Sequence, residues 1–214
     1  MNPPNILAAA LLAVSAAFAH AAPPSADAPQ TPAERKIAAA RAAVEKTPGS
    51  GAAHARLAMA LAQRARETAD PAFYERAHAA IAESFKREPD NLEARRARVW
   101  VLLGQHQFAQ ALEEAQALNQ RIPDDLQVYA YLVDAYVELG RYADAERAAQ
   151  WLLDLRPGTV SGLTRAAYLR ELFGDLDGAT DFMEKAYQRT PPTETEDRAW
   201  LLTHLAHLRL LQNR

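Results

Sequence analysis

Hydrophobic residues recur with helical spacing along most of the chain after residue 30. In the segment 126–157 they follow the i, i+3, i+4, i+7 spacing of one helix face, at Tyr129, Leu132, Val133 and Tyr136. Gly140 interrupts this pattern, and a second apolar set restarts it at Tyr142, Ala145, Ala149, Leu152 and Leu153. The segment therefore predicts two helices joined by a short turn. Stretches typical of strands are missing throughout, so the predicted fold class is all-α.

A 34-residue period runs through the middle of the chain. Prolines recur at this interval, at Pro89, Pro123, Pro157 and Pro191. Twelve residues before each proline stands an alanine, namely Ala77, Ala111, Ala145 and Ala179. Three residues before each alanine stands a large apolar residue, namely Tyr74, Phe108, Tyr142 and Leu176. Three residue classes that share one period indicate a repeat protein rather than a set of unrelated helices.

Each recurrent residue has a physical role in a pair of helices. The alanine is small because two antiparallel helices approach closely there, and the proline ends the second helix. Gly140 and Gly174 supply the positive φ of the turn inside a pair. Three segments have the form of a capping box at a helix start: Thr31–Glu34, Asp90–Glu93 and Thr193–Glu196.

These residues resemble the tetratricopeptide repeat (TPR) family. The resemblance implies a right-handed superhelical solenoid of antiparallel helix pairs, with about ten helices over residues 31–214. It divides this region into four near-complete repeats, 51–89, 92–123, 126–157 and 160–191, with half-units at 32–48 and 195–214. The first repeat fits if about seven residues are inserted near Glu67–Phe73. His106 and Asn213 stand where the other units have the turn glycine.

The first thirty residues have the features of an export signal. Ile6 to Ala19 is an apolar run of fourteen residues, followed by the small-x-small sequence Ala19-His20-Ala21. This predicts a signal peptide over residues 1–21, cleaved after Ala21, and a flexible spacer over 22–30. The mature protein is then expected in the periplasm or outside the cell. The alternatives are an uncleaved N-terminal membrane anchor and a wrongly assigned start codon, because residues 1–5 contain no Lys or Arg.

Composition favours binding over catalysis. The formal net charge is −3, with 14 basic and 11 acidic residues in 31–123 and 10 and 15 in 124–214, so nucleic-acid binding is not expected. The chain has no cysteine, which excludes disulfides and thiolate chemistry. His204 and His207 share a helix face without a third ligand, and Asp175–Gly178 lacks the other ligands of a calcium loop. We therefore expect no catalytic residues, no metal, no cofactor and no small-molecule substrate.

The resemblance also implies where a protein or peptide partner binds. In the TPR family the first helices of the repeats line a concave groove. The residues expected to face it are Ala55, Arg56, Met59, Arg96, Trp100, Gln127, Ala130, Asp134, Glu138, Thr164, Tyr168 and Glu171. This projection gives a groove that is basic early and acidic late, with Trp100 and Tyr168 as aromatic anchors. Arg56 lies at the groove's edge, and Trp100 is equally compatible with a place in the core.

The last helix predicted by the sequence is apolar around most of its circumference. Residues 200–211 contain a tryptophan and six leucines, which is unusual for the outer helix of a solenoid. Three functions are therefore open. They are a scaffold that binds a partner in the groove, a subunit of an envelope or secretion assembly that acts or self-associates through residues 200–211, and the N-terminal repeat region of a longer enzyme or receptor.

Overall fold

The computed structural model describes residues 31–213, and this part of the chain contains ten α-helices. Their bounds are α1 Pro32–Lys46, α2 Gly51–Thr68, α3 Ala72–Arg87, α4 Leu92–Gly104, α5 Phe108–Arg121, α6 Leu126–Glu138, α7 Tyr142–Leu155, α8 Val160–Leu172, α9 Leu176–Arg189 and α10 Thr195–Leu211. Within residues 31–213 there is no strand. The predicted all-α class and the number of helices are confirmed.

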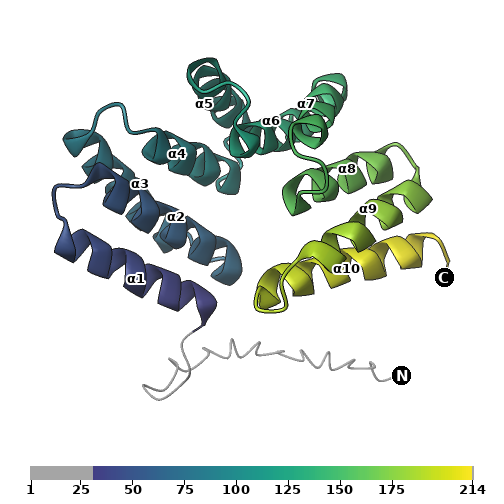
Figure 1. Ribbon diagram of the computed structural model, residues 1–214, viewed down its shortest axis with the longest axis horizontal. Helices are drawn as coiled ribbons and strands as arrows, with labels where there is room; N and C mark the ends of the chain where they lie inside the picture. Colours follow the sequence, from purple (N-terminus) through teal and green to yellow (C-terminus); the bar gives the residue numbers. More distant parts are fainter. Residues whose placement is uncertain (1–30, 214) are drawn as a thin grey trace, which may run out of the picture. The chain divides into compact units, whose positions relative to one another are not determined.

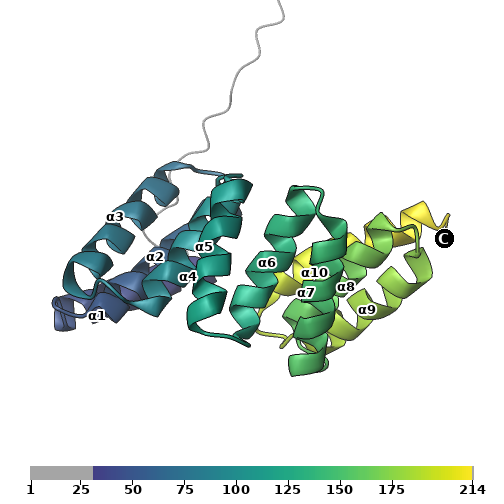
Figure 2. The same cartoon turned by 90° about the horizontal axis from the view of Figure 1, so that it is seen from above.

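The helices succeed one another as antiparallel pairs. Each of the predicted repeats contains one pair, from α2 and α3 to α8 and α9, while α1 and α10 stand in the two half-units. Figure 1 shows the pairs following an arc, with α4, α6 and α8 on its inner side and α5 and α7 on its outer side. Figure 2 shows the same succession from above. We call the members of a pair the first and the second helix.

The periodic residues have the structural roles that their spacing predicts. Every second helix from α3 to α9 ends two residues before its proline. All four periodic alanines are fully buried, at 0% exposure: Ala77, Ala111, Ala145 and Ala179. The large residue three positions earlier is partly exposed in each repeat, and Tyr142 is 43% exposed. The small alanine side chain is thus enclosed, while the larger side chain three positions earlier reaches the surface.

The turns inside the pairs use left-handed backbone. Gly140 and Gly174 have φ angles of 69° and 82°, as predicted. His106 (φ 59°) and Asn213 (φ 57°) adopt the same conformation at the equivalent positions. In the first repeat the turn residue is Ala69, with φ 53°. Here α2 has 18 residues against 13 in α4, so part of the insertion lengthens this helix.

Helix starts agree less well with the capping boxes. At α1 the box is present, because Thr31 accepts from Glu34 N and Glu34 accepts from Thr31 N. At α4 the cap is Asn91 rather than Asp90, and its side chain accepts from Ala94 N at 2.8 Å. At α10 no side chain caps the helix, which begins at Thr195 after Glu194. The first box is confirmed and the other two are wrong.

The expected signal peptide and spacer lie outside the described residues. Within residues 31–213 none of the helices has the length and apolarity required to cross a membrane.

Candidate functional site

A chain of cavities follows the inner side of the arc. One of about 520 Å³ lies between α1, α2 and α4, and one of about 410 Å³ lies between α4, α6 and α8. A smaller cavity of about 250 Å³ joins α2, α4 and α6. Met59 lines all three of these cavities, so they form one continuous groove along the first helices.

Trp100 belongs both to the groove and to the core. Its ring lies 5.8 Å from that of Tyr131 and packs beside two of the buried clusters. The guanidinium of Arg66 lies over the indole, 4.3 Å from the ring centroid. The same side chain of Trp100 lines the groove cavities of about 520 and 410 Å³ and a further cavity of about 420 Å³ that contains Arg66. Trp100 is therefore a half-buried wall between neighbouring cavities, and both of the sequence-based alternatives hold.

Three residues predicted to face a partner instead connect neighbouring first helices. Arg96 of α4 forms an ion pair with Asp125 at 2.5 Å, and Asp125 caps α6. Asp134 of α6 forms an ion pair with Arg165 of α8 at 2.5 Å. Glu171 of α8 accepts from the His207 ring of α10 at 3.1 Å. Each of these side chains lies on the inner side, but it is engaged in the contact between repeats. Because these charges are paired, the predicted change along the groove from a basic early part to an acidic late part is weakened.

Arg56, Gln127 and Glu138 remain accessible on the groove side, whereas Ala55 and Ala130, which were also predicted to face it, are buried. Arg56 is exposed and lines the cavities next to Met59. Gln127 lines the groove and donates to the Tyr131 hydroxyl at 2.6 Å. Glu138 is exposed beside the cavity that contains Arg66.

Tyr168 is 40% exposed but lines none of these cavities. Partial burial raises the pKa of its hydroxyl, and the nearby Glu138 and Glu171 carboxylates raise it further. The aromatic anchor expected from Tyr168 therefore stands apart from the groove cavities.

Sequence reasoning missed the contribution of α1 to the groove. Lys36, Ala39, Ala40 and Ala43 form one wall of the largest cavity, and Gln63 of α2 stands at its edge. A signal was available, because Lys36 lies twelve residues before Pro48, where the full repeats have their buried alanine. A lysine there indicates that the side chain is not covered by a first helix.

The motifs that resembled metal sites have structural roles. Asp175 caps α9 by accepting from Gly178 N at 2.9 Å, and this contact lowers the pKa of its carboxyl. His204 lies 4.0 Å from the Trp200 ring, and His207 contacts Glu171. Among the described residues no group of three or more His, Asp or Glu side chains could hold a metal ion.

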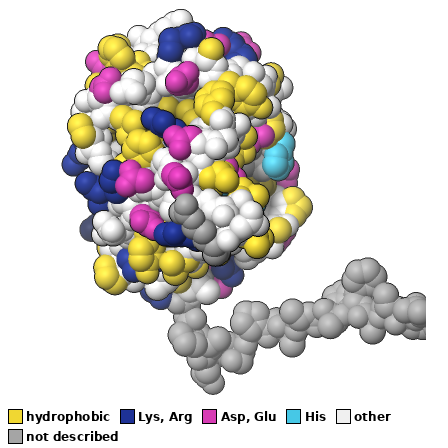
Figure 3. All heavy atoms as spheres, turned by 90° about the vertical axis from the view of Figure 1, so that its right-hand side faces the viewer, with side chains coloured by type: hydrophobic (Ala, Val, Ile, Leu, Met, Phe, Trp, Pro, Cys, Tyr) yellow, Lys and Arg dark blue, Asp and Glu magenta, His cyan; other side chains and the backbone are white. Residues whose placement is uncertain are grey.

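The terminal helix α10 exposes an apolar surface. Leu201 and Leu208 are buried against the preceding pair, whereas Leu202 is 49% and Leu210 74% exposed. Figure 3 looks onto the end of the molecule that contains α8 to α10 and shows hydrophobic side chains among charged ones. Leu202 lies eleven residues before Asn213, as Tyr129 lies before Gly140. Tyr129 stacks on Trp151 of the second helix of its own pair, so Leu202 occupies a position that a further helix would cover.

Comparisons with known proteins show the fold alone. No protein-family profile matches the chain, and no curated protein sequence matches it. Among solved structures, the TPR protein TTC0263 of Thermus thermophilus has a TM-score of 0.62 at 21% identity, over 75% of this chain and 84% of that one. PilF of Pseudomonas aeruginosa has a TM-score of 0.56 at 16% identity, over 84% of each chain. The Cut9–Hcn1 structure has a TM-score of 0.70 at 12% identity, over 85% of this chain and 34% of that one. The chain therefore has a TPR-like fold.

Proposed function

We propose that this chain is a non-enzymatic protein-interaction scaffold whose groove holds a segment of a partner protein. The observation that carries the proposal is the continuous row of cavities along α2, α4 and α6, with Met59 and Trp100 on its wall. Partly exposed Met and Trp side chains in a concave apolar surface are typical of sites that anchor a partner. The similar structure of Cut9 with Hcn1 is named as a hetero-tetramer, which accords with this use of the fold.

The polar groups of the groove favour holding over chemistry. Arg96 and Asp134 are engaged in ion pairs between repeats, so these two charges are already used within the fold. Burial raises the pKa of the Tyr131 hydroxyl, and therefore it stays protonated at neutral pH. These groups rigidify the groove, and a rigid groove reduces the entropy that a bound segment costs.

A test compares binding by variants on the two sides of the arc. Arg56→Glu and Glu138→Lys change exposed groove residues, whereas Glu113→Lys changes an exposed residue of α5 on the outer side. Peptides selected from a random library on the wild-type chain should lose affinity for the two groove variants and keep it for Glu113→Lys. Equal affinity for all three variants would remove the groove from the proposal.

We further propose that the scaffold works outside the cytoplasm, as a periplasmic or secreted protein. The support is the apolar run Ile6–Ala19 followed by Ala19-His20-Ala21. Amino-terminal sequencing of the protein from fractionated cells should give Ala22 as the first residue, in the fraction outside the inner membrane. An intact Met1 in the membrane fraction would instead favour the uncleaved anchor.

A second candidate function is assembly through α10, including self-association through residues 200–211. Its support is the exposure of Leu202 and Leu210 on that helix. Sedimentation velocity at increasing concentration should show association that Leu202→Glu/Leu210→Glu abolishes. A concentration-independent monomer would leave the groove as the interaction surface.

A further inference from the structure

The cavity of about 520 Å³ lies beside α1, a second helix that has no first helix packed before it within residues 31–213. In the four full repeats, the residue twelve positions before the proline is an alanine at 0% exposure. In α1 this position, counted from Pro48, holds Lys36, which is exposed. Within residues 31–213 no first helix precedes α1, and the adjacent Ala39 is exposed as well. The face that is covered in every other pair is therefore open here.

The walls of this cavity are apolar and made of small side chains. Three of its apolar residues come from α1, at Ala39, Ala40 and Ala43, and three come from α2 and α4, at Met59, Ala60 and Trp100. Its volume of about 520 Å³ lies in the range of pockets that bury a ligand. Such a volume accommodates two large apolar side chains side by side. The alanine side chains of α1 are short, and in the full repeats the corresponding space is filled by the first helix of the pair.

The rim of the cavity carries two cations without a carboxylate partner. Among the described residues, neither Lys36 nor Arg56 forms an ion pair, and no Asp or Glu lines this cavity. Lys36 Nζ donates to the side-chain oxygen of Gln63 at 3.3 Å. By contrast, Arg96 and Arg165 further along the groove are both paired with aspartates. Among the described basic side chains that line the three groove cavities, Lys36 and Arg56 are thus the two without an ion pair.

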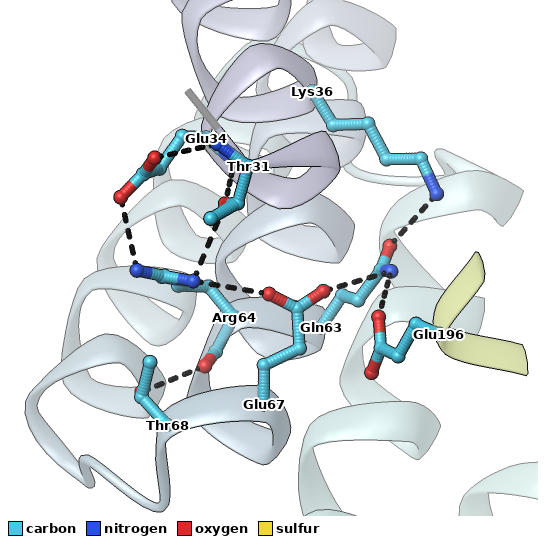
Figure 4. A network of polar contacts seen from close by, with 8 residues as sticks. All are labelled: Thr31, Glu34, Lys36, Gln63, Arg64, Glu67, Thr68 and Glu196. Carbon is cyan, nitrogen blue, oxygen red and sulfur yellow. Dashed lines mark hydrogen bonds and ion pairs between the residues drawn. The ribbon is translucent and has the colours of Figure 1, made fainter. Parts of the chain in front are cut away.

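A carboxyl group of the chain itself already lies at the edge of the cavity. Glu196, at the start of α10, accepts from Gln63 Nε2 at 3.5 Å. Figure 4 shows Lys36 and Glu196 approaching the two ends of the same Gln63 amide. The edge thus already holds one carboxyl group, while the Gln63 amide donates to Glu67 as well, so the charges of Lys36 and Arg56 are what a partner carboxylate would meet.

We propose that this cavity binds a partner segment in which a pair of large apolar side chains adjoins acidic residues. The inference rests on the proposed function, since it specifies the ligand of the same groove. The apolar pair fills the alanine-walled space, and the acidic residues pair with Lys36 and Arg56 at the rim. A second copy presenting α10 is the competing occupant. Next to its exposed leucines that helix carries Arg209, already paired with Glu184, and not a carboxylate, so it suits a cationic rim less well.

The test uses fluorescence anisotropy with the full chain and three labelled peptides. Each peptide contains the same Leu-Phe pair, flanked by glutamates, by glutamines or by lysines. We expect the glutamate peptide to bind about fivefold to tenfold more tightly than the glutamine peptide, as two partly exposed ion pairs allow, and the lysine peptide to bind most weakly. Added salt should reduce the differences in affinity among the three peptides.

Variants of α1 and α2 test whether the peptides bind in this cavity. Ala39→Trp fills the space and should abolish binding, whereas Ala42→Trp, exposed on the same helix but outside the cavity, is the matched control. In the double variant Lys36→Glu/Arg56→Glu, the lysine peptide should bind more tightly than the glutamate peptide. That reversal requires a folded chain, so it also excludes misfolding as the cause of lost binding.

Each other outcome overturns the inference in a distinguishable way. Equal affinity for the three peptides refutes the acidic preference. If the peptides still bind Ala39→Trp but are lost from Glu138→Lys, the groove proposal stands and this cavity is not the subsite. Binding that no groove variant changes refutes both proposals. Self-association of the wild type that Ala39→Trp abolishes would make the occupant a second copy.

Discussion

The side-chain amide of Gln63 in α2 donates to the carboxyl of Glu196 in α10, 133 positions further along the chain. Repeats in a solenoid contact their sequence neighbours, so a bond between the first pair and the last helix is unusual. The same Gln63 amide donates to Glu67 at 3.1 Å, and Glu67 pairs with Arg64. Two carboxyl groups from opposite ends of the solenoid therefore share one amide (Figure 4).

This arrangement predicts a pH-dependent contribution from Glu196. Partial burial raises the pKa of its carboxyl above 4.5, and the neighbouring Glu67 raises it further. Between about pH 4.5 and the folded-state pKa, the Glu196 carboxyl is therefore more protonated in the folded chain than in the unfolded chain. The free energy of unfolding falls as pH rises through this range. Glu196→Gln removes the charge and keeps an oxygen acceptor, so it should raise the melting temperature at pH 7. The gain in melting temperature over the wild type should become smaller toward pH 4.

The control is Glu194→Gln, which removes one negative charge at the same end of α10. Glu194 is exposed and its side chain does not cap the helix. Melting curves from pH 4 to pH 8 should show the pH-dependent gain for Glu196→Gln alone. An equal gain in both variants would mean that general charge reduction, and not the Glu67–Glu196 contact, is responsible.

The turn at the end of α2 provides a second prediction. Ala69 adopts a left-handed φ of 53° and is exposed, and an L-residue with a Cβ is strained there. Ala69→Gly should therefore raise the free energy of unfolding by about 0.5 to 1 kcal/mol, after the larger unfolded-state entropy of glycine is subtracted.

The reverse change at an equivalent turn is the matched experiment. Gly140 has a φ of 69°, and no atom of a neighbouring residue would lie within 4 Å of a Cβ added there. Gly140→Ala therefore tests backbone strain without a steric clash. It should lower the free energy of unfolding by about 1 kcal/mol in urea titrations. If both variants shift stability in the same direction, the backbone explanation is wrong.

Much of the fold was predictable because its determinants are local and repeated. A proline that ends a helix, a glycine in a turn and a small alanine at a helix crossing each act within one pair, so their period reveals the architecture. Helix starts were less predictable. Asp90 and Asn91 are adjacent and both suit a cap, and the choice between them depends on the preceding turn.

The candidate site was predictable only in part. Spacing placed Arg96, Asp134 and Glu171 on the inner side, but not their pairing. Their partners lie 29, 31 and 36 positions away, and the distance across neighbouring first helices depends on how successive repeats stack. The position of Lys36 stands out only beside the complete repeats, where the same place holds a buried alanine.

A third prediction separates the two roles of Asp125. Its Oδ1 accepts from the backbone N–H of Gln127 and Val128, and its Oδ2 accepts from Arg96. Asp125→Ala loses both roles and should cost about 1 to 2 kcal/mol of stability. Asp125→Asn keeps an acceptor for the cap and loses the charge, so it should cost less, about 0.5 to 1 kcal/mol.

Urea unfolding of both variants beside Thr159→Ala checks this division. Thr159 caps α8 by accepting one hydrogen bond from Gly162 N, and its hydroxyl carries no charge, so Thr159→Ala measures the loss of a cap alone. Raised salt should reduce the cost of Asp125→Asn and leave that of Thr159→Ala unchanged. An Asn variant as unstable as the Ala variant would show that the charge, not the cap, dominates.

The periodic alanines provide the last prediction, since all four are fully buried. Ala111 of α5 is fully buried in the central cluster, so Ala111→Leu forces extra methylenes into packed space and should cost about 1 to 3 kcal/mol. Ala109→Leu, exposed on the same helix, should stay within about 0.5 kcal/mol of the wild type. Hydrogen exchange should show the loss of protection by Ala111→Leu first in α4 and α5, because each repeat packs mainly against its neighbours. Equal effects of the two leucines would mean that helix propensity, rather than close approach, explains the 34-residue recurrence of alanine.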